Sequence, residues 1–257
     1  MNKITETFKN KKAFIAYIMG GDPNIEKTRE YILAIEKAGA DLIEIGIPFS
    51  DPIAEGEVIE RANLRAYNSG TNLDKLFDML LSLKGIVKIP ILFMTYLNPI
   101  FHYKYDKFFE KCLNCGISGV IIPDMPFEEH EEILPFSDKY SIDIITLITP
   151  TSNNRIEHAA KNAKGFIYLV SSMGVTGIRS EIKTDISKII SNIKQYTDVP
   201  IAVGFGIHNP EQAKNFSKQA DGIIVGSAIV NLIEQHGENA MDIIFEYVRA
   251  MKNAITT

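Results

Sequence analysis

Short runs of apolar, β-branched and aromatic residues recur along the whole chain, and longer stretches with helical spacing of apolar positions separate them. Runs that are apolar at every position are typical of strands buried on both faces, as in a parallel sheet covered by helices. The pattern predicts eight strands, at residues 14–19, 42–45, 91–94, 119–122, 144–148, 166–170, 201–203 and 222–225.

Amphipathic stretches between these strands predict helices. They lie at residues 25–38, 59–68, 73–83, 106–114, 128–136, 154–163, 182–196 and 210–218. Helix boundary signals agree with two of them: Asn209 before Pro210 is typical of a helix start, and Lys37 followed by Gly39 is typical of a helix end.

The alternation of strands and helices predicts the fold class. Eight β/α units over 257 residues match a single-domain (β/α)8 TIM barrel that fills residues 1–257, because no Ser-, Gly- or Pro-rich linker divides the chain. A doubly wound open sheet is the alternative. In a barrel, the functional site is expected in the loops after the carboxyl ends of the strands.

Composition excludes several classes of protein. With 46% hydrophobic residues, 23% charged residues and a net charge of −5, the chain resembles an ordinary globular protein without a basic surface for nucleic acid or an anionic membrane. No apolar run approaches the roughly 18 residues of a membrane span. The basic stretch 9–12 before the apolar run 13–19 is similar to the start of a secretory signal. A Gly-Gly-Asp-Pro turn follows without a cleavage site, so the apolar run is interpreted as a strand. A cytoplasmic location is therefore expected.

Cys112 and Cys115 form the only Cys-x-x-Cys pair. A structural zinc site needs four donors, and no histidine stands at ligand spacing beside the pair. The pair falls at the end of a predicted helix, where the helix dipole disfavours a thiolate. Buried, reduced thiols are therefore expected, and no metal site is predicted.

Glu44 interrupts the apolar strand at residues 42–45. Burying a carboxylate without partners costs several kcal/mol or raises its pKa. A carboxyl with a raised pKa is suited to general acid or base catalysis near neutral pH, although a buried salt bridge is the alternative interpretation.

Glycines gather after the last three predicted strands, at residues 171–179, 204–207 and 226–228. Such loops are neighbours in a barrel, and glycine lets a phosphate approach backbone N–H groups. A short helix that begins at Gly226 and Ser227 would direct its free N–H groups and positive dipole at the anion. A phosphate site is therefore predicted, although turns need glycine for other reasons too.

Four motifs together resemble the tryptophan synthase alpha chain family over nearly the whole length. They are the segments 44–52 (EIGIPFSDP), 148–152 (ITPTS), 174–177 (GVTG) and 203–207 (VGFGI). The resemblance implies a barrel lyase that cleaves indole-3-glycerol phosphate to indole and glyceraldehyde 3-phosphate. It also implies an α2β2 heterotetramer with a β subunit that carries pyridoxal phosphate, so no cofactor is expected in this chain.

Carried over by position, the resemblance makes Glu44 the acid/base glutamate at the end of the second strand. Glu55 matches the second catalytic position, where the family usually has aspartate. The additional methylene changes the reach of this carboxylate. Glu57 stands where the family commonly has proline. We expect Glu44 to transfer protons at indole C3 and at the glycerol hydroxyl, and Glu55 to contact the indole N–H.

The remaining site residues also follow from the resemblance, which implies a substrate pocket made of several loops. Thr176 is expected to orient Glu55. The phosphate site is expected to contain Gly177, Phe205, Gly206, Gly226 and Ser227, and the indole pocket Tyr17 and Tyr168. As aromatic residues on strands, these two tyrosines have plain core packing as their alternative. Asp124 is expected to support the site from outside, and Asp51 matches a position near the β-subunit contact.

Two long loops, at residues 48–58 and 171–183, exceed the usual length of a βα connection and are predicted to close over the substrate. Two other functions stay open at this point. A different sugar-phosphate barrel enzyme would share the glycine loops but would call for a metal or a lysine at a strand end. A catalytically weak barrel that only activates a partner would account for the unusual Glu55.

Overall fold

The computed structural model describes residues 3–53, 55–150, 155–170, 186–204 and 206–256. Its strands form one parallel sheet with the order β5-β4-β3-β2-β1-β9-β8-β7-β6. The strands are β1 Ala13–Met19, β2 Leu42–Gly46, β3 Ile91–Met94, β4 Ile117–Ile121, β5 Asp143–Ile144, β6 Thr146–Ile148, β7 Ile167–Val170, β8 Ile201–Gly204 and β9 Gly222–Val225.

The two outermost strands of this order are halves of one predicted strand. Only Ile145 separates β5 from β6; β5 pairs with β4, and β6 pairs with β7. Ile145 itself donates a hydrogen bond from its N–H to the carbonyl oxygen of Val120 at 2.9 Å. The sheet therefore closes into a ring of eight strands, and the predicted (β/α)8 barrel is confirmed.

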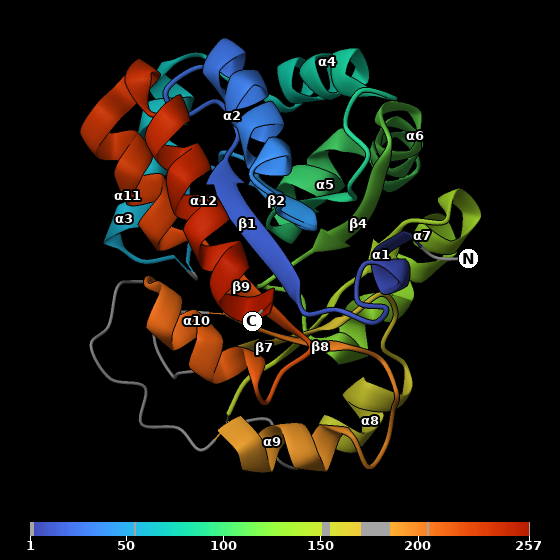
Figure 1. The fold of residues 1–257 in the computed structure, drawn as a ribbon. Helices are drawn as coiled ribbons and strands as arrows, with labels where there is room; N and C mark the ends of the chain where they lie inside the picture. The colour runs from blue at the N-terminus through green and yellow to red at the C-terminus, as the bar shows by residue number, and fades with distance from the viewer. Residues whose placement is uncertain (1–2, 54, 151–154, 171–185, 205, 257) are drawn as a thin grey trace.

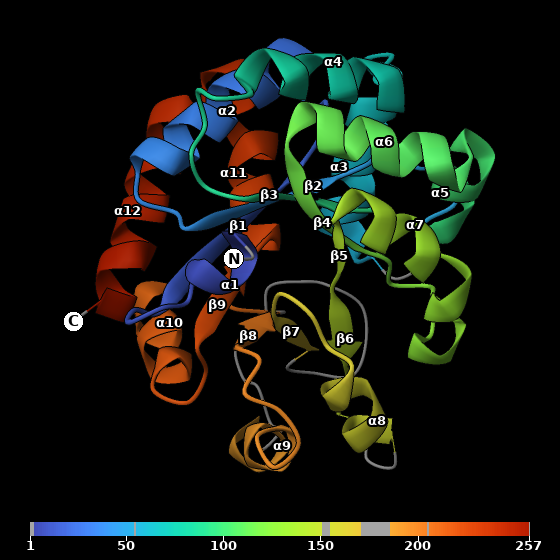
Figure 2. The ribbon, with the colours of Figure 1, turned by 90° about the vertical axis from the view of Figure 1, so that its right-hand side faces the viewer.

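Helices surround the ring of strands (Figures 1 and 2). They are α1 Lys3–Glu6, α2 Ile25–Lys37, α3 Glu57–Asn68, α4 Leu73–Leu83, α5 Leu97–Tyr103, α6 Tyr105–Cys115, α7 Leu134–Tyr140, α8 Ile156–Lys161, α9 Ile186–Ile193, α10 Pro210–Ser217, α11 Ser227–His236 and α12 Met241–Thr256, with short 3-10 helices η1 Phe127–Glu132 and η3 Gly237–Asn239. None of the described helices is long and apolar enough to cross a membrane.

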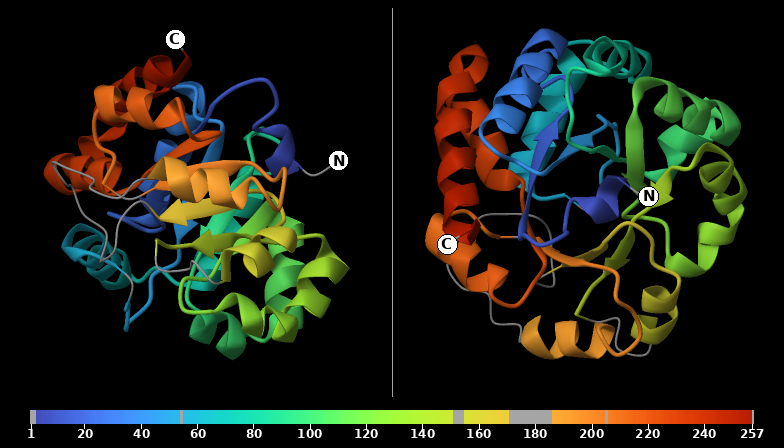
Figure 3. Two further views of the ribbon diagram at one scale, coloured as in Figure 1. Left: turned by 90° about the horizontal axis from the view of Figure 1, so that it is seen from below. Right: turned by 45° about the vertical axis from the view of Figure 1, so that its right-hand side comes forward.

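Two apolar layers hold the barrel together. The larger layer lies between strands and helices, and the smaller one fills the inside of the ring with residues from every strand except β5, next to which Ile145 takes part. Ile4 and Phe8 from the N-terminal segment join the inner layer, and the Phe8 ring packs against Phe166 at 5.6 Å between centroids. Helix α1 thus covers the amino end of the barrel, as the right-hand view of Figure 3 shows. The opposite end stays available for a functional site.

One predicted helix is divided in the structure. The pattern predicts a single helix over residues 128–136, whereas the chain forms η1 and then α7. Pro135 lies in the first turn of α7. Proline has no N–H to continue the preceding hydrogen-bond ladder, so the helix restarts there. The prediction for Cys112 and Cys115 is confirmed, because both thiols are free and buried on α6.

A buried carboxylate, Asp41, joins the two ends of the chain at the amino face of the barrel. It accepts hydrogen bonds from Phe14 N at 2.7 Å, Lys11 Nζ at 2.6 Å and Lys252 Nζ at 2.6 Å. Hydrogen bonds to charged groups contribute more than neutral ones, so Asp41→Asn should lower the free energy of unfolding by about 2 kcal/mol in urea titrations. Glu6→Gln, which breaks an exposed ion pair with Lys9, is the control and should change it by less than about 0.5 kcal/mol. Equal losses in the two variants would contradict this role of Asp41.

Candidate active site

Glu44 lies on β2 with its side chain inside the barrel. Leu42, two residues earlier, belongs to the inner layer, and alternate residues of a strand face the same side. Glu44 is 1% exposed, and its Oε1 is buried without a hydrogen-bond partner among the described residues. Burial disfavours the charged form and raises the pKa of Glu44 from 4.5 to about 8. The carboxyl is therefore mostly protonated at neutral pH.

Tyr17 and Tyr168 flank Glu44 inside the barrel. Tyr17 pairs in register with Glu44, and both tyrosines are 5% exposed. Burial first, and the nearby carboxyl of Glu44 in addition, raise the pKa of both phenols well above 10. The two phenols are therefore neutral, and the structure brings the predicted indole-pocket residues together around Glu44.

Glycines on the neighbouring strands make room for these two rings. A Cβ atom at Gly46 would lie 2.3 Å from Tyr17 Oη, and one at Gly204 would lie 2.6 Å from Tyr168 Oη. Real side chains do not approach so closely, so a larger residue at either position would displace a tyrosine. The tyrosines thus fill specific gaps at the carboxyl end of the barrel.

Glu55 lies in the loop after β2 and is also part of this cluster. Its Oε2 is buried without a hydrogen-bond partner among the described residues. Burial raises the pKa of Glu55 to about 7, and the charge of Glu60 adds to this effect, while a hydrogen bond with Tyr96 opposes it. Glu55 also raises the pKa of Tyr17 through its charge. Glu44 and Glu55 therefore approach the same tyrosine from two elements.

Tyr96 and Asn63 are site residues that the sequence analysis missed. Tyr96 accepts a hydrogen bond from Ile53 N at 3.1 Å, and its ring packs on Phe49 at 5.3 Å between centroids. Asn63 of α3 accepts from Phe49 N at 2.8 Å and donates to the carbonyl oxygen of Phe49. Both residues hold the loop that carries Glu55. The position of Tyr96 just after β3 is a signal that could have revealed it.

The predicted phosphate site is described in part. Gly206 has a φ of 83°, and its carbonyl oxygen lies 2.9 Å from His208 Nδ1. Helix α11 begins at Ser227, and Gly226 has no side chain that could cap its first N–H groups. A Cβ atom at Gly226 would lie 3.3 Å from Tyr17, so this helix start faces the side of the barrel mouth where Tyr17 lies. Among the described residues no side chain caps this helix start, and a helix N-terminus of this kind has the geometry that an anion needs.

Three of the predicted site residues, Thr176, Gly177 and Phe205, lie outside the described residues. Asp124 accepts a hydrogen bond from Leu97 N at 2.9 Å, so it holds the first turn of α5. Asp124 also lines a cavity of about 240 Å³ between the ends of β4 and β6. Asp51 is exposed and accepts a hydrogen bond from Ser50 Oγ at 2.5 Å. Neither aspartate lies among the buried carboxyls of the site.

Comparisons with known proteins agree on one family. The family model of the tryptophan synthase alpha chain matches residues 4–256. The tryptophan synthase alpha chain of Lacticaseibacillus casei is 47% identical over 255 residues, which cover 99% of this chain and 96% of that protein. The solved structure of tryptophan synthase subunit alpha from Legionella pneumophila has a TM-score of 0.88 at 32% identity, over 99% of this chain and 98% of that chain.

A second solved structure, of a protein from Aquifex aeolicus VF5, has a TM-score of 0.91 at 33% identity and covers 100% of both chains. The match extends from the first strand to the last helix in sequence and in structure. It includes the strand with Glu44 and the helix that begins at Ser227. The chain belongs to the tryptophan synthase alpha chain family.

Proposed function

We propose that Glu44 and Glu55 perform the acid/base chemistry of this lyase, which cleaves indole-3-glycerol phosphate to indole and glyceraldehyde 3-phosphate. The observation that carries the proposal is the pair of buried carboxyl oxygens, one on each residue, that have no partner among the described residues. Unpartnered buried polar atoms are rare, and they are expected where a ligand completes the hydrogen bonding. Both carboxyls have raised pKa values, as general acids and bases near neutral pH require.

The cleavage begins with protonation of indole C3. Glu44 is suited to this step because it keeps its proton at neutral pH. The carboxylate that results then takes the proton of the glycerol hydroxyl at C1′. The C3–C1′ bond breaks, its electron pair returns to the indole ring, and C1′ becomes the aldehyde carbon of glyceraldehyde 3-phosphate. One carboxyl thus serves as acid and then as base.

Glu55 acts at the indole nitrogen. Protonation at C3 places positive charge on the ring and makes its N–H acidic, so an ionised carboxylate beside the nitrogen stabilises this state. The hydrogen bond with Tyr96 favours the ionised form of Glu55. Thr176 is proposed to orient Glu55 when substrate is bound. Tyr96 thus anchors the carboxylate of Glu55, whose side chain is one methylene longer than that of aspartate.

The rest of the substrate is proposed to bind at the carboxyl end of the barrel. Tyr17 and Tyr168 form the indole pocket beside Glu44. The phosphate binds backbone N–H groups of the glycine loops and the start of α11, and its residues are Gly177, Phe205, Gly206, Gly226 and Ser227. The uncapped start of α11 supports this placement.

We propose that the partner of the chain is the tryptophan synthase β subunit and that the two form an α2β2 complex, which membership in the alpha chain family supports. We propose that the pyridoxal phosphate of the complex belongs to the β subunit, that this chain itself needs no cofactor, and that the complex works in the cytoplasm. We also propose that residues 1–257 form one domain, since one ring of strands includes elements from β1 to β9.

The test is to incubate the purified chain with indole-3-glycerol phosphate and to measure indole, first alone and then with a β subunit. Indole release by the chain alone supports the proposed lyase. A higher rate with the β subunit supports partner-driven closure of the loops at residues 48–58 and 171–183, the second of which lies outside the described residues. An unchanged rate would contradict that closure, and no indole under either condition would contradict the lyase.

The rate should also depend on pH through both carboxyls. The reaction needs Glu55 ionised and Glu44 protonated, so kcat/KM should rise as Glu55 loses its proton near pH 7 and fall as Glu44 loses its proton near pH 8. Measurement from about pH 5.5 to about 9.5 should give a narrow bell. In Glu55→Gln the acid limb should disappear while the alkaline limb stays. A wild-type profile that is flat over this range would contradict the assignment.

A further inference from the structure

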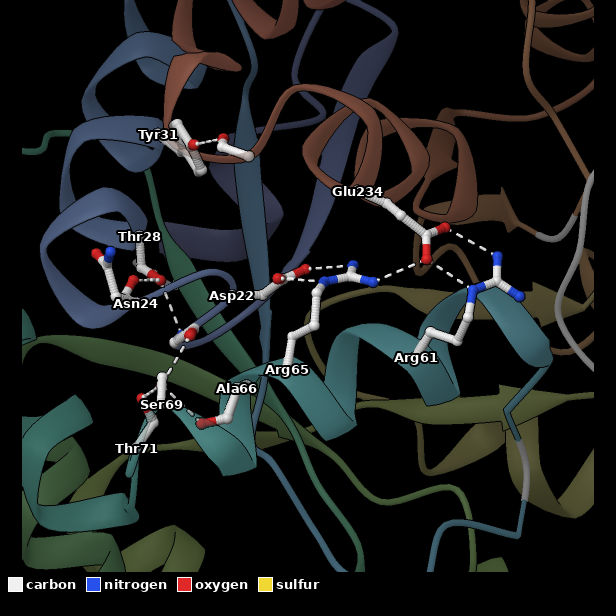
Figure 4. A network of polar contacts seen from close by, with 12 residues as sticks. Asp22, Asn24, Thr28, Tyr31, Arg61, Arg65, Ala66, Ser69, Thr71 and Glu234 are labelled. Atoms are coloured by element: carbon white, nitrogen blue, oxygen red, sulfur yellow. Dashed lines mark hydrogen bonds and ion pairs between the residues drawn. The ribbon is translucent and has the colours of Figure 1, made fainter.

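Four charged side chains form a continuous chain of ion pairs beside the active site, and the mechanism above does not use them (Figure 4). Arg65 of α3 binds Asp22 of the β1–α2 turn at 2.8 and 2.9 Å. Arg65 also binds Glu234 of α11 at 2.9 Å. Arg61 of α3 binds the same Glu234 at 2.7 and 2.8 Å. Glu234 is therefore shared by two guanidinium groups of one helix.

The ion pairs of this network are more strictly oriented than an ordinary surface ion pair. The Asp22–Arg65 and Arg61–Glu234 pairs are both bidentate, which fixes the direction of each side chain. Asp22 at one end is 0% exposed, Arg65 and Glu234 in the middle are 29% and 25% exposed, and Arg61 at the other end is 49% exposed. Isolated exposed pairs contribute little, but networks with good geometry are the exception.

The two helices that Glu234 joins both begin at the active site. Helix α3 starts at Glu57, two residues after Glu55. Helix α11 starts at Ser227, directly after Gly226, which lies beside Tyr17. The contact through Glu234 therefore connects the segment that carries Glu55 to the helix that is proposed to hold the phosphate.

The far end of α3 is fixed by other contacts (Figure 4). Ser69 Oγ donates to the carbonyl oxygen of Gly21 at 3.2 Å, and Gly21 N donates to Thr28 Oγ1 at 2.8 Å. Arg65 binds Asp22 in the same turn. The last turns of α3 are thus attached to the β1–α2 turn, and Glu234 joins the middle of α3 to α11 through Arg61 and Arg65.

We propose that Glu234 is a positioning residue for Glu55. It holds Arg61 and Arg65, and it thereby sets the place of the first turn of α3 relative to the start of α11. The inference rests on the proposed function, because the place of Glu55 matters only if Glu55 takes part in the cleavage. Loss of the contact should leave the phosphate bound to α11 but misalign the carboxylate with the indole ring. Such a change lowers kcat and leaves KM nearly unchanged.

The test compares indole release by five forms of the full chain: wild type, Glu234→Gln, Arg61→Gln, the double variant, and Glu246→Gln as control. Glu246 pairs only with Arg249 among the ion pairs of the described residues, on the exposed surface of α12, and its substitution changes the net charge equally. Glu234→Gln should lower kcat about tenfold and keep KM within about twofold. The double variant should lose no more than Glu234→Gln alone, because Arg61→Gln breaks, apart from a long 3.9 Å pair with Glu57, only a contact that Glu234→Gln has already broken. Glu246→Gln should match the wild type.

Thermal midpoints measured on all five forms separate positioning from unfolding, since every form should be fully folded at the assay temperature. A wild-type chain that releases no indole overturns the proposed function itself, and the positioning role with it. An active wild type with an equally active Glu234→Gln overturns only the positioning role. Losses that add up in the double variant, or a rise in KM in place of a fall in kcat, overturn it as well.

Discussion

Replacing Glu44 with glutamine is expected to lower kcat for indole release by about 10³-fold, because one positioned proton-transfer group contributes roughly 10² to 10⁴. Glutamine keeps the size of the side chain but can neither donate a proton to indole C3 nor accept one from the hydroxyl. KM should change little, since the carboxyl acts on the reacting atoms. The measurement is steady-state indole formation, with Glu36→Gln as control, a half-buried acid on α2 whose carboxylate holds backbone N–H groups of Lys88 and Ile89.

The same substitution should stabilise the fold at alkaline pH. The pKa of Glu44 in the folded state is about 8, above its ordinary value of 4.5, so the folded state binds this proton more tightly than the unfolded state does. The stability that results is complete below about pH 4.5 and is lost as the pH rises through 8. Glutamine does not ionise, so Glu44→Gln avoids this loss. Its thermal midpoint should exceed that of the wild type more at about pH 9 than at about pH 6.

These two results discriminate between the functions that the sequence leaves open. A barrel that only activates a β subunit would keep its full effect in Glu44→Gln, since a buried side chain of unchanged size preserves the outer surface. An enzyme that relied on a lysine or a metal would keep most of its rate. A loss of less than tenfold in kcat would therefore exclude Glu44 as the acid, and a thermal midpoint difference independent of pH would exclude the raised pKa.

The fold was largely predictable because its strands are buried on both faces. Runs that are almost entirely apolar stand out from the amphipathic helices around them, so the predicted strands agree with the observed ones to within about two residues. The break at Ile145 was not predictable, because it reflects a change of pairing partner from β4 to β7. Helices α1, α5 and α12 were missed. Pro99 in α5 is tolerated because the first turn of a helix needs no N–H from it.

The site was predictable only where a single residue breaks a local pattern. Glu44 could be recognised because a carboxylate in an apolar strand is costly, and strand alternation then places it inside the barrel. Tyr96 breaks no local pattern and is marked only by its position just after β3, since its role depends on the loop of Glu55 folding over it. Glu234 lies 173 residues from Arg61 along the chain, and no periodicity connects the two positions.

The largest loss of stability is expected from Arg65→Met. Asp22 is fully buried, and the guanidinium of Arg65 binds both of its oxygens. Burial already raises the pKa of Asp22, with Arg65 opposing this effect. Methionine keeps the bulk of the side chain but leaves the buried carboxylate without its cation, which typically costs about 3–5 kcal/mol. The free energy of unfolding from urea titration at pH 8 is the measurement.

The pH dependence of Arg65→Met identifies the cause of this loss. Without Arg65 the pKa of Asp22 rises further, so the folded variant binds a proton more tightly than the unfolded chain, and its stability falls as the pH rises through that value. The deficit should therefore be smaller near pH 5 than near pH 8, and Asp22→Asn in the same chain should recover part of it. Arg249→Met breaks the exposed pair with Glu246 and should cost less than about 1 kcal/mol. If Arg65→Met cost no more than this control at either pH, the charge of Asp22 would not depend on Arg65, and the anchoring of α3 through this pair would be wrong.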